Sequence, residues 1–460
     1  MGKKGTRVVS DSMGDIQVPQ NALYGAQTQR ALNNFKISNL TLPSAFIRSL
    51  AEIKKCAAHT NAQLGELNED LARAIIDAAD QVIAGKHVEQ FAVDVFQTGS
   101  GTSSNMNINE VLAGICQSQH GLTVHPNDHV NMGQSSNDVI PTAIQLAAVT
   151  QLHTRLLPAF AQLSKTLDTK ARESQDIIKT GRTHLMDAMP ISLAQELLGW
   201  KAQVEAGTHQ LLAYMPNLTA LAQGGTAVGT GVNSHPQFAE RFAQNMSAQM
   251  SGTLDITFSP SSNFFKSIGS QDLSVGLAGH LRVLATTLYK ISTDLRWMNS
   301  GPLAGLGEIE LQALQPGSSI MPGKVNPIIP EAVSMACAQV VGNDATISMA
   351  GMSGNFQLNT MLPVIAYNLL QSIDLLTNSA HELGTKCIAN FTINHKNINA
   401  TIERNPILAT ALAPKIGYEA AAKIAKIAYQ TQQPILDVAI AETDLDAKEL
   451  RRLLDPKHNI

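Results

Sequence analysis

The sequence LSVGLAGHLRVLATTLYKISTDLRWM, residues Leu273–Met298, decides the fold. Its apolar residues recur at steps of three and four: Leu273, Leu277, Leu281, Leu284, Leu288, Ile291, Leu295 and Met298. That spacing predicts one apolar stripe along a helix of about seven turns. Ser270 is suited to cap the start of this helix, and Gly301-Pro302 should end it.

Other segments repeat the pattern at comparable length. We expect helices over Ile140–Leu167, with a kink at Pro158, and over Ile191–Leu212. A further long stripe comprises Leu362, Leu369, Ile373, Leu376 and Leu383. A shorter helix should begin near Pro330 and end near Gly342. Long helices of this kind cannot bury their stripes alone, so they should pack side by side as a bundle.

The pattern divides the chain into three regions. They are an N-terminal region of short helices and loops over 1–138, a long-helix bundle over 139–393, and a small helical region over 394–460. In the last region, short helices are expected at Ala420–Tyr429 and Ala447–Leu454. We therefore predict a mainly α fold, in which a central bundle is flanked by smaller N- and C-terminal helical domains.

Composition limits the class of protein and its partners. Hydrophobic residues make up 44% and charged residues only 15%, which is too apolar for a disordered chain and indicates that other subunits cover part of the surface. The formal net charge is -4 without blocks of like charge. Nucleic acid is therefore not an expected partner, and an anionic substrate must be attracted by local groups.

The cysteines and the N-terminus indicate a compartment. The four cysteines, Cys56, Cys116, Cys337 and Cys387, lie apart in helix-like segments without the spacing of metal ligands. They are expected to be buried thiols in a reducing environment. The N-terminus lacks the apolar core of a signal peptide, and no apolar run reaches the length of a membrane span. We expect a cytoplasmic protein without membrane contact.

Connections rich in Gly, Ser, Thr and Asn separate the predicted helices. The main ones are Gln97–Asn107, Gly224–Pro236 and Gly317–Pro327. Such loops expose backbone N–H groups and tolerate unusual dihedral angles, which suits anion binding. The last loop, GSSIMPGKVNP, is not a phosphate-binding P-loop, because five residues separate its glycines and Val325 follows the lysine. From its residues alone it is either a surface crossover loop or a binding loop.

The loop Gly317–Pro327 matches the GSSxMPxKxNP signature of the aspartase/fumarase superfamily at every fixed position. The resemblance extends over nearly the whole chain. Further matching segments are Gln97–Thr102 with Asn105–Asn107, His125–Asp128, Gln134–Asp138, Gly181–His184 and Gly225–Gly231.

The side chains between these fixed points resemble those of class II fumarate hydratases, the fumarase C type. Aspartases typically carry Gln in place of His184 and Asn in place of His125, whereas fumarases carry His at both positions. One departure is the segment Asn326–Glu331, which lacks the Thr-Gln-Cys of many fumarases and ends as aspartases do.

The resemblance implies a lyase that reversibly hydrates fumarate to malate in the citric acid cycle by anti addition and elimination. It implies Ser318 as the base for the carbon-bound proton, a role that demands a strongly perturbed site. Lys324 and Asn326 would hold the carboxylate that collects charge. His184, oriented by Glu331, would act on the water side, because imidazole both gives and accepts protons near neutral pH. The resemblance implies no cofactor.

The implied dicarboxylate pocket is polar and mostly uncharged. Its residues are Ser100, Gly101, Thr102, Ser135, Ser136, Asn137, Thr183, Ser319, Lys324, Val325 and Asn326. Hydroxyl, amide and backbone N–H groups can hold two carboxylates without several arginines. Taken singly, each of these residues is more often a turn or cap residue.

The segment His125-Pro126-Asn127-Asp128 resembles a second anion site near the entrance of the fumarase pocket. Fumarases carry an arginine three residues upstream, where this chain has Leu122, which weakens or removes that site. His129 lies close enough to suggest a metal, but Pro126 and Asn127 favour a turn and no distant ligand completes a set. No metal is expected.

The resemblance also implies a homotetramer, whose subunits share the helical core and assemble each active site from three chains. The expected partner is a small dicarboxylate, fumarate or malate. One alternative is another lyase of the superfamily, such as aspartate ammonia-lyase or, less favoured, argininosuccinate or adenylosuccinate lyase. Another is a homologue that binds dicarboxylates without turnover. Against this second alternative stand Ser318, Lys324, Asn326, His184 and Glu331, which are all present.

Overall fold

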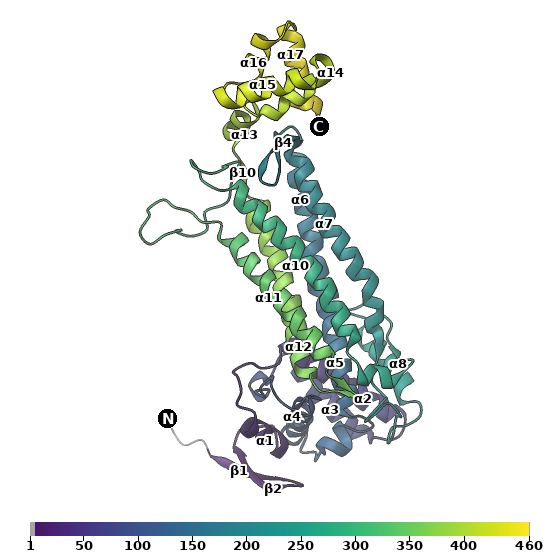
Figure 1. Cartoon of the computed structure of the whole chain (residues 1–460). Coiled ribbons are helices and arrows are strands. Elements are labelled where there is room, and N and C mark those ends of the chain that lie inside the picture. Colours follow the sequence, from purple (N-terminus) through teal and green to yellow (C-terminus); the bar gives the residue numbers. More distant parts are fainter. Residues whose placement is uncertain (1–4, 460) are drawn as a thin grey trace. The chain divides into compact units, whose positions relative to one another are not determined.

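Long helices dominate residues 5–459, which are described here by a computed structural model, and strands occur in this range only as short pairs (Figure 1). The chain forms two compact units. Unit 1 comprises Met1–Pro158, Thr208–Ala285 and Cys337–Thr377, and unit 2 comprises Ala159–Gly207, Thr286–Ala336 and Asn378–Ile460. The predicted mainly α fold is confirmed.

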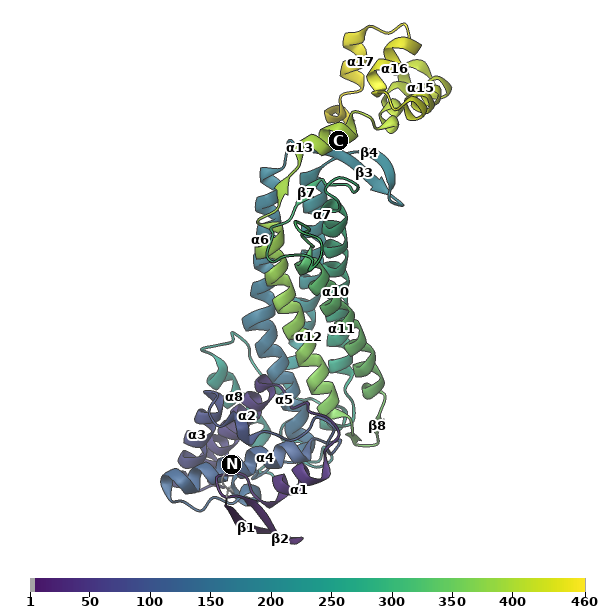
Figure 2. The same ribbon diagram turned by 90° about the vertical axis from the view of Figure 1, so that its left-hand side faces the viewer.

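Unit 1 has its core among α2 (Ser44–Gln63), α3 (Glu69–Ile83), α4 (Thr102–His120), α5 (Ser136–Gln151) and α8 (Phe238–Met250), which gather side by side (Figure 2). In α2, the apolar residues Phe46, Leu50, Ile53 and Ala57 follow helical spacing and are buried on one face. Asn68 caps α3 by accepting from two backbone N–H groups. The core thus combines amphipathic helices such as α2 with α5, which is buried on all sides from Asp138 to Val149.

Short elements complete unit 1. They are β1 (Thr6–Asp11), β2 (Gly14–Pro19), α1 (Ala26–Asn34), η1 (Val88–Gln90), η2 (Pro126–Val130), η3 (Leu152–Leu156), η4 (Met215–Thr219), β5 (Ala220–Leu221), β6 (Ser259–Pro260), α9 (Phe264–Gly269), β8 (Gly354–Asn355) and β9 (Leu358–Asn359). β1 pairs with β2 and β8 with β9 in antiparallel register, whereas β5 and β6 are parallel.

Unit 2 contains the antiparallel β3–β4 hairpin, long helical segments and a cluster of short C-terminal helices (Figure 1). Its elements are α6 (Leu157–Glu173), β3 (Ile178–Thr183), β4 (Met186–Ser192), β7 (Ile309–Glu310), η5 (Leu383–Ile388), β10 (Thr392–Ile393), α13 (His395–Ile402), η6 (Pro406–Leu412), α14 (Ala413–Ile416), α15 (Tyr418–Thr431), α16 (Ile435–Glu442), α17 (Ala447–Leu453) and η7 (Pro456–Asn459). Leu412, Ile424, Val438 and Leu450 form the core of the C-terminal cluster. The helices predicted there are confirmed as α15 and α17.

The boundary between the units falls inside long helices. These are α7 (Leu193–Tyr214), α10 (Asp272–Met298), α11 (Ile328–Gly351) and α12 (Leu362–Glu382). The stripe predicted for α10 is buried from Leu277 to Met298, with Met298 only 3% exposed. Within unit 2, Lys201 of α7 pairs with Asp168 of α6 at 2.8 Å. Across residues 5–459, no helix combines the length and the apolar run that a bilayer crossing requires.

Three predicted details can be compared with these bounds. The predicted cap of α10 is wrong, because the helix begins at Asp272 and Ser270 instead follows α9. The predicted end of α11 near Gly342 is also wrong, since a glycine inside a helix costs only about 1 kcal/mol relative to alanine and does not stop it. Pro158, the position of the expected kink, lies in the first turn of α6, directly after the π-helical turn η3 that ends at Leu156, and the kink itself stays a prediction.

Candidate active site

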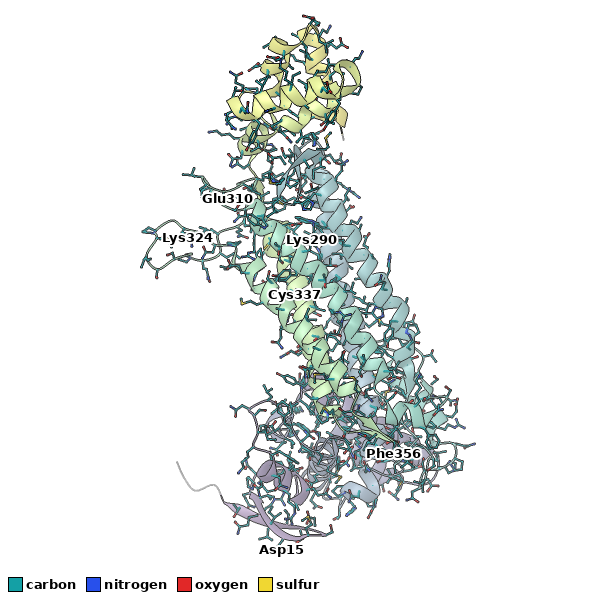
Figure 3. The ribbon with its side chains drawn as sticks, in the orientation of Figure 1. Asp15, Lys290, Glu310, Lys324, Cys337 and Phe356 are labelled. Atoms are coloured by element: carbon teal, nitrogen blue, oxygen red, sulfur yellow. The ribbon has the colours of Figure 1, made fainter. Side chains whose placement is uncertain are left out.

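The loop Gly317–Pro327, here called the signature loop, lies in unit 2 between β7 and α11. Its neck is closed by Gly317 N–H, which donates to Lys324 O at 2.9 Å, and by Asn326 Nδ2, which donates to Gly317 O at 2.7 Å. A Cβ on Gly317 would lie 2.3 Å from Lys324 O, so this closure requires glycine. Figure 3 shows Lys324 on this loop, away from the helices of unit 2.

Ser318 is the second residue of the signature loop, and backbone N–H groups of the loop hold its side chain. The hydroxyl oxygen accepts from Met321 N–H at 3.0 Å and from Ile320 N–H at 3.3 Å. Hydrogen bonds from N–H donors stabilise negative charge on an oxygen. These are the only two donors to Ser318 Oγ within residues 5–459, and its role as a base stays a prediction.

Unit 2 has an open cleft of about 920 Å³ beside the signature loop. Lys324, Val325, Asn326 and Glu331 line it together with the end of α10, and Figure 3 places Glu310 on the same side of the unit as Lys324. Glu331 is half-buried in the first turn of α11. The structure thus brings four of the predicted site residues to one cleft.

Thr183 and His184 lie at the tip of the β3–β4 hairpin in unit 2. Thr183 pairs with Met186, so that His184 and Leu185 form the two-residue turn. Their φ angles are 55° and 61°, in the left-handed region that such turns usually fill with Asn-Gly. Each non-glycine residue held there costs about 1–3 kcal/mol, and such strain is concentrated at functional sites. The turn presents the imidazole on the exposed surface of the unit.

Some predicted partners do not meet within one chain. Among residues 5–459, His184 shares no hydrogen bond with Glu331 or with Ser318. The pairing of His184 with Glu331 therefore stays a prediction.

The segment Ser135–Asp138, here called the capping segment, lies in unit 1 at the start of α5. Ser135 and Asp138 form a capping box, in which Ser135 N–H donates to Asp138 Oδ1 at 2.9 Å. Asn137 Nδ2 donates to Ala227 O at 2.8 Å. The side chains predicted to bind substrate here are therefore fixed within the unit.

A chain of hydroxyl groups joins the capping segment to the start of α4. Ser100 Oγ lies 2.8 Å from Thr102 Oγ1, which lies 2.7 Å from Ser136 Oγ. Gly101 precedes α4 at a φ of 73°, and a Cβ there would lie 2.9 Å from Ile140 Cγ1. Helix N-termini such as those of α4 and α5 favour carboxylates. Unit 1 thus brings together Ser100, Thr102 and Ser136, three of the hydroxyl residues that the resemblance implies for the dicarboxylate pocket.

Asp138 is a structural residue that the sequence interpretation missed. It is fully buried, and its Oδ2 accepts from Gly224 N–H at 3.0 Å and Thr226 N–H at 2.9 Å. Burial raises the pKa of Asp138 to about 6, although these N–H groups, Ser135 N–H and nearby Lys54 oppose the shift. Its place at the third position of a capping box was a sequence signal for the bond to Ser135 N–H, but not for the bonds to Gly224 and Thr226.

Lys54 of α2 was also missed. It is fully buried, and its Nζ donates to Asn131 Oδ1 at 2.9 Å and to Gln134 Oε1 at 3.0 Å. Burial lowers the pKa of Lys54 to about 7, partly opposed by Asp138. The only sequence signal was a lysine one residue after Ile53 on the buried face of α2.

The segment predicted as a second anion site forms a tight turn in unit 1. Asp128 N–H donates to His125 Nδ1 at 3.1 Å, and His125 N–H donates to His129 Nδ1 at 2.9 Å. Pro126 opens the π-helical turn η2, which confirms the expected turn. Within the described part of the chain, no group of three His, Cys, Asp or Glu side chains is arranged to hold a metal.

Comparisons with known proteins identify the family of this chain. Residues 14–342 match the family described as Lyase, and residues 408–458 match the family described as Fumarase C C-terminus. The chain is 55% identical to fumarate hydratase class II 2 of Pseudomonas aeruginosa, over 98% of each chain. It is 52% identical to fumarate hydratase class II of Xylella fastidiosa, over 98% of this chain and 94% of the relative.

A solved structure gives the same result for the fold. The crystal structure of a recombinant class II fumarase from Schistosoma mansoni matches with a TM-score of 0.94 and 38% identity, over 98% of each chain.

Proposed function

This chain belongs to the class II fumarate hydratases, and we propose that Ser318, His184 and Glu331 carry out its reaction. The enzyme adds water reversibly across the double bond of fumarate to give malate. Relatives at 46–55% identity carry the name fumarate hydratase class II, so an ammonia-lyase activity is not favoured.

On the carbon side, Ser318 Oγ takes the proton from the malate carbon beside a carboxylate. The observation that carries this assignment is the pair of backbone N–H groups aimed at Ser318 Oγ. The electron pair of the broken C–H bond passes to the adjacent carboxylate, whose oxygens become more negative. Lys324 and the amide of Asn326, with Ser319 and Val325 of the same loop, hold that carboxylate.

On the oxygen side, His184 donates a proton to the hydroxyl group, which leaves the neighbouring carbon as water. In hydration, the neutral imidazole takes the proton back from the attacking water. Glu331 orients the ring and stabilises its charged form, as carboxylates do for catalytic histidines. Thr183 beside His184 positions the water. The base and the acid act on opposite faces of the substrate, which gives anti elimination.

The capping segment and the hydroxyl groups at the start of α4 bind the second carboxylate of the substrate. Ser100, Thr102, Ser136 and Asn137 supply side-chain donors, and the starts of α4 and α5 supply backbone N–H groups, including those after Gly101 and Ser135. The turn His125–Asp128 is kept as a second anion site, weakened by Leu122 in place of arginine.

We further propose a cytoplasmic homotetramer, in which each active site takes residues from three chains. The site residues support this, because they lie on separate segments of both units and His184 shares no hydrogen bond with Glu331 within residues 5–459 of one chain. A closed symmetric oligomer can combine such segments from neighbouring subunits.

The activity test mixes the purified protein with fumarate, without added cofactor, and follows the loss of absorbance of the double bond. Aspartate runs in parallel with ammonia detection. We expect malate from fumarate and no ammonia. Ammonia from aspartate would support the superfamily alternative, and binding of dicarboxylates without turnover would indicate an inactive homologue.

The residue test uses Ser318→Ala and His184→Asn. Each should lower turnover at least about a hundredfold, since each removes an acid–base group. Gel filtration should show that both variants assemble as the parent does. Near-normal turnover in either variant would refute the role assigned to that residue.

A further inference from the structure

The β3–β4 hairpin that carries Thr183 and His184 rests on a buried ionic network in unit 2. Lys179 Nζ lies 2.7 Å from Glu308 Oε2 and 2.7 Å from Glu196 Oε2. Arg182 Nη2 donates to Glu308 Oε1 at 2.7 Å. The Glu308 side chain is only 1% exposed and that of Lys179 only 2%. One carboxylate thus joins two cations of the same strand, the second of them two residues before His184.

The charges of this network balance each other. The cations Lys179 and Arg182 face the anions Glu196 and Glu308, and each oxygen of Glu308 has its own cation. Buried ion pairs contribute little stability over apolar side chains of the same volume, but removing one partner leaves an uncompensated charge. Such a network therefore fixes geometry more than it adds stability.

The turn at the tip of the β3–β4 hairpin is strained and needs support from the rest of the hairpin. His184 and Leu185 both hold positive φ angles, which favour glycine or asparagine. The base of the hairpin is fixed tightly, because a Cβ on Gly181 would lie 2.6 Å from Met189 O. The register shifts between Thr180 and Arg182, which marks a bulge that twists the strands locally. The tip is exposed while the base is held.

Glu308 is itself anchored by its backbone. Its N–H donates to Met298 O at 2.8 Å at the end of α10, and its carbonyl accepts from Asn394 N–H at 2.9 Å. Its neighbours Gly307 and Ile309 line the same cleft as Lys324 and Glu331. Glu308 therefore connects the base of the hairpin to the wall of the cleft of unit 2.

We propose that Glu308, acting through Arg182 and Lys179, is a positioning residue that sets where the β3–β4 hairpin presents His184. The proposal rests on the proposed role of His184. A supporting residue locks a catalytic group at the productive distance, and misplacement by about 1 Å can cost about a hundredfold in rate. Carboxylate binding relies on other residues, so loss of Glu308 should lower kcat far more than it raises KM.

The test is a double-mutant cycle of Glu308→Gln with His184→Asn, measured as kcat and KM for fumarate. Glutamine keeps the shape of Glu308 and removes its charge. We expect Glu308→Gln alone to lower kcat at least about tenfold with less than about a threefold change in KM. In the His184→Asn background it should lower kcat by less than about twofold, because its target is already gone.

The outcomes separate the two proposals. An equal loss from Glu308→Gln in both backgrounds would show a general structural role and overturn the positioning role. Normal turnover of Glu308→Gln beside an inactive His184→Asn would also overturn it. Near-normal turnover of His184→Asn itself would refute the proposed function of His184.

A second pair of variants avoids a change at the buried carboxylate. Arg182→Met should reproduce the kcat loss, and Arg182→Lys, which keeps the charge, should recover part of it. Lys201→Met is the matched control, since it breaks the 2.8 Å pair with Asp168 in the same unit. The control should keep the parent kcat. Equal kcat values for Arg182→Met and Lys201→Met would overturn the proposal.

Discussion

The capping segment of unit 1 and the signature loop of unit 2 carry the polar residues that we propose bind one substrate, yet they are built in opposite ways. Asp138 in the capping segment is fully buried and accepts from Ser135, Gly224 and Thr226. The signature loop is largely exposed and is closed at its neck between Gly317 and Asn326. Asp138 belongs to the core of unit 1, whereas the signature loop is exposed from Ser319 to Val325.

Because of this difference, substitutions in the two segments should affect stability and activity to different degrees. Substitutions in the signature loop remove groups proposed to contact substrate but few that hold the fold, since exposed loops carry function without packing. Substitutions in the capping segment disturb the core first and the substrate contacts through it. The comparison therefore predicts which variants lose turnover, which lose stability, and which lose both.

Replacing Lys324 should have the largest effect on turnover. Lys324→Met removes the cation proposed to hold the charge-collecting carboxylate, so kcat/KM for fumarate should fall at least about a hundredfold. The thermal midpoint should stay at the parent value, because the side chain is exposed. Steady-state kinetics and thermal unfolding measure both.

Lys86→Met, at an exposed lysine on a loop of unit 1, is the control and should leave kcat/KM unchanged. A large drop in the midpoint for Lys324→Met would break the comparison, since the signature loop would then support the fold.

Replacing Asp138 should cost stability. Asp138→Asn keeps the shape but turns an amide group toward backbone N–H donors of Gly224 and Thr226. We expect the free energy of unfolding to fall by about 3 kcal/mol, as for buried donors left without partners and a lost cap. Denaturant unfolding checks this. A change below about 0.5 kcal/mol, typical of surface substitutions, would contradict the account of the capping segment.

Replacing Ser136 should have a moderate effect on substrate binding. Ser136→Ala removes the last hydroxyl of the chain from Ser100 through Thr102. One lost hydrogen bond to a charged carboxylate is worth about 1.5–3 kcal/mol, which corresponds to at least about a tenfold rise in KM. The same measurement on Ser118→Ala, at an α4 serine outside the site, serves as control. An unchanged KM would remove Ser136 from the substrate site.

Treatment with a thiol reagent should have the smallest effect. Burial raises the pKa values of Cys116, Cys337 and Cys387 to about 12 and raises that of Cys56 even further. Thiolate is the reactive form, so a disulfide reagent at pH 8 should label none of them in the folded protein. All should react after unfolding. Rapid labelling of the folded protein would show that the core opens.

The sequence predicted the fold where the signal was local. The apolar stripe of α10 fixed both the position and the burial of that helix, because helical spacing is written in neighbouring residues. Gly342 misled the prediction of where α11 ends, since one glycine does not outweigh a long apolar pattern.

The site was predictable only in part. Motif resemblance predicted Ser318, Lys324 and the hydroxyl groups at the start of α4, but the network around Lys54 and Asp138 joins segments far apart in the chain. Such contacts depend on tertiary packing and leave no periodic pattern. The left-handed turn at His184 and Leu185 was also hidden, because neither residue type indicates it.

The central claim is that Ser318 and His184 serve one fumarate site and come from different chains. The most direct test mixes unfolded Ser318→Ala and His184→Asn chains, refolds them together and measures turnover of fumarate. If each site draws these residues from different chains, roughly a quarter of the sites in random tetramers are intact, and roughly a quarter of the parent turnover returns. Turnover that stays at the level of the two variants, although mixed tetramers form, would contradict the account.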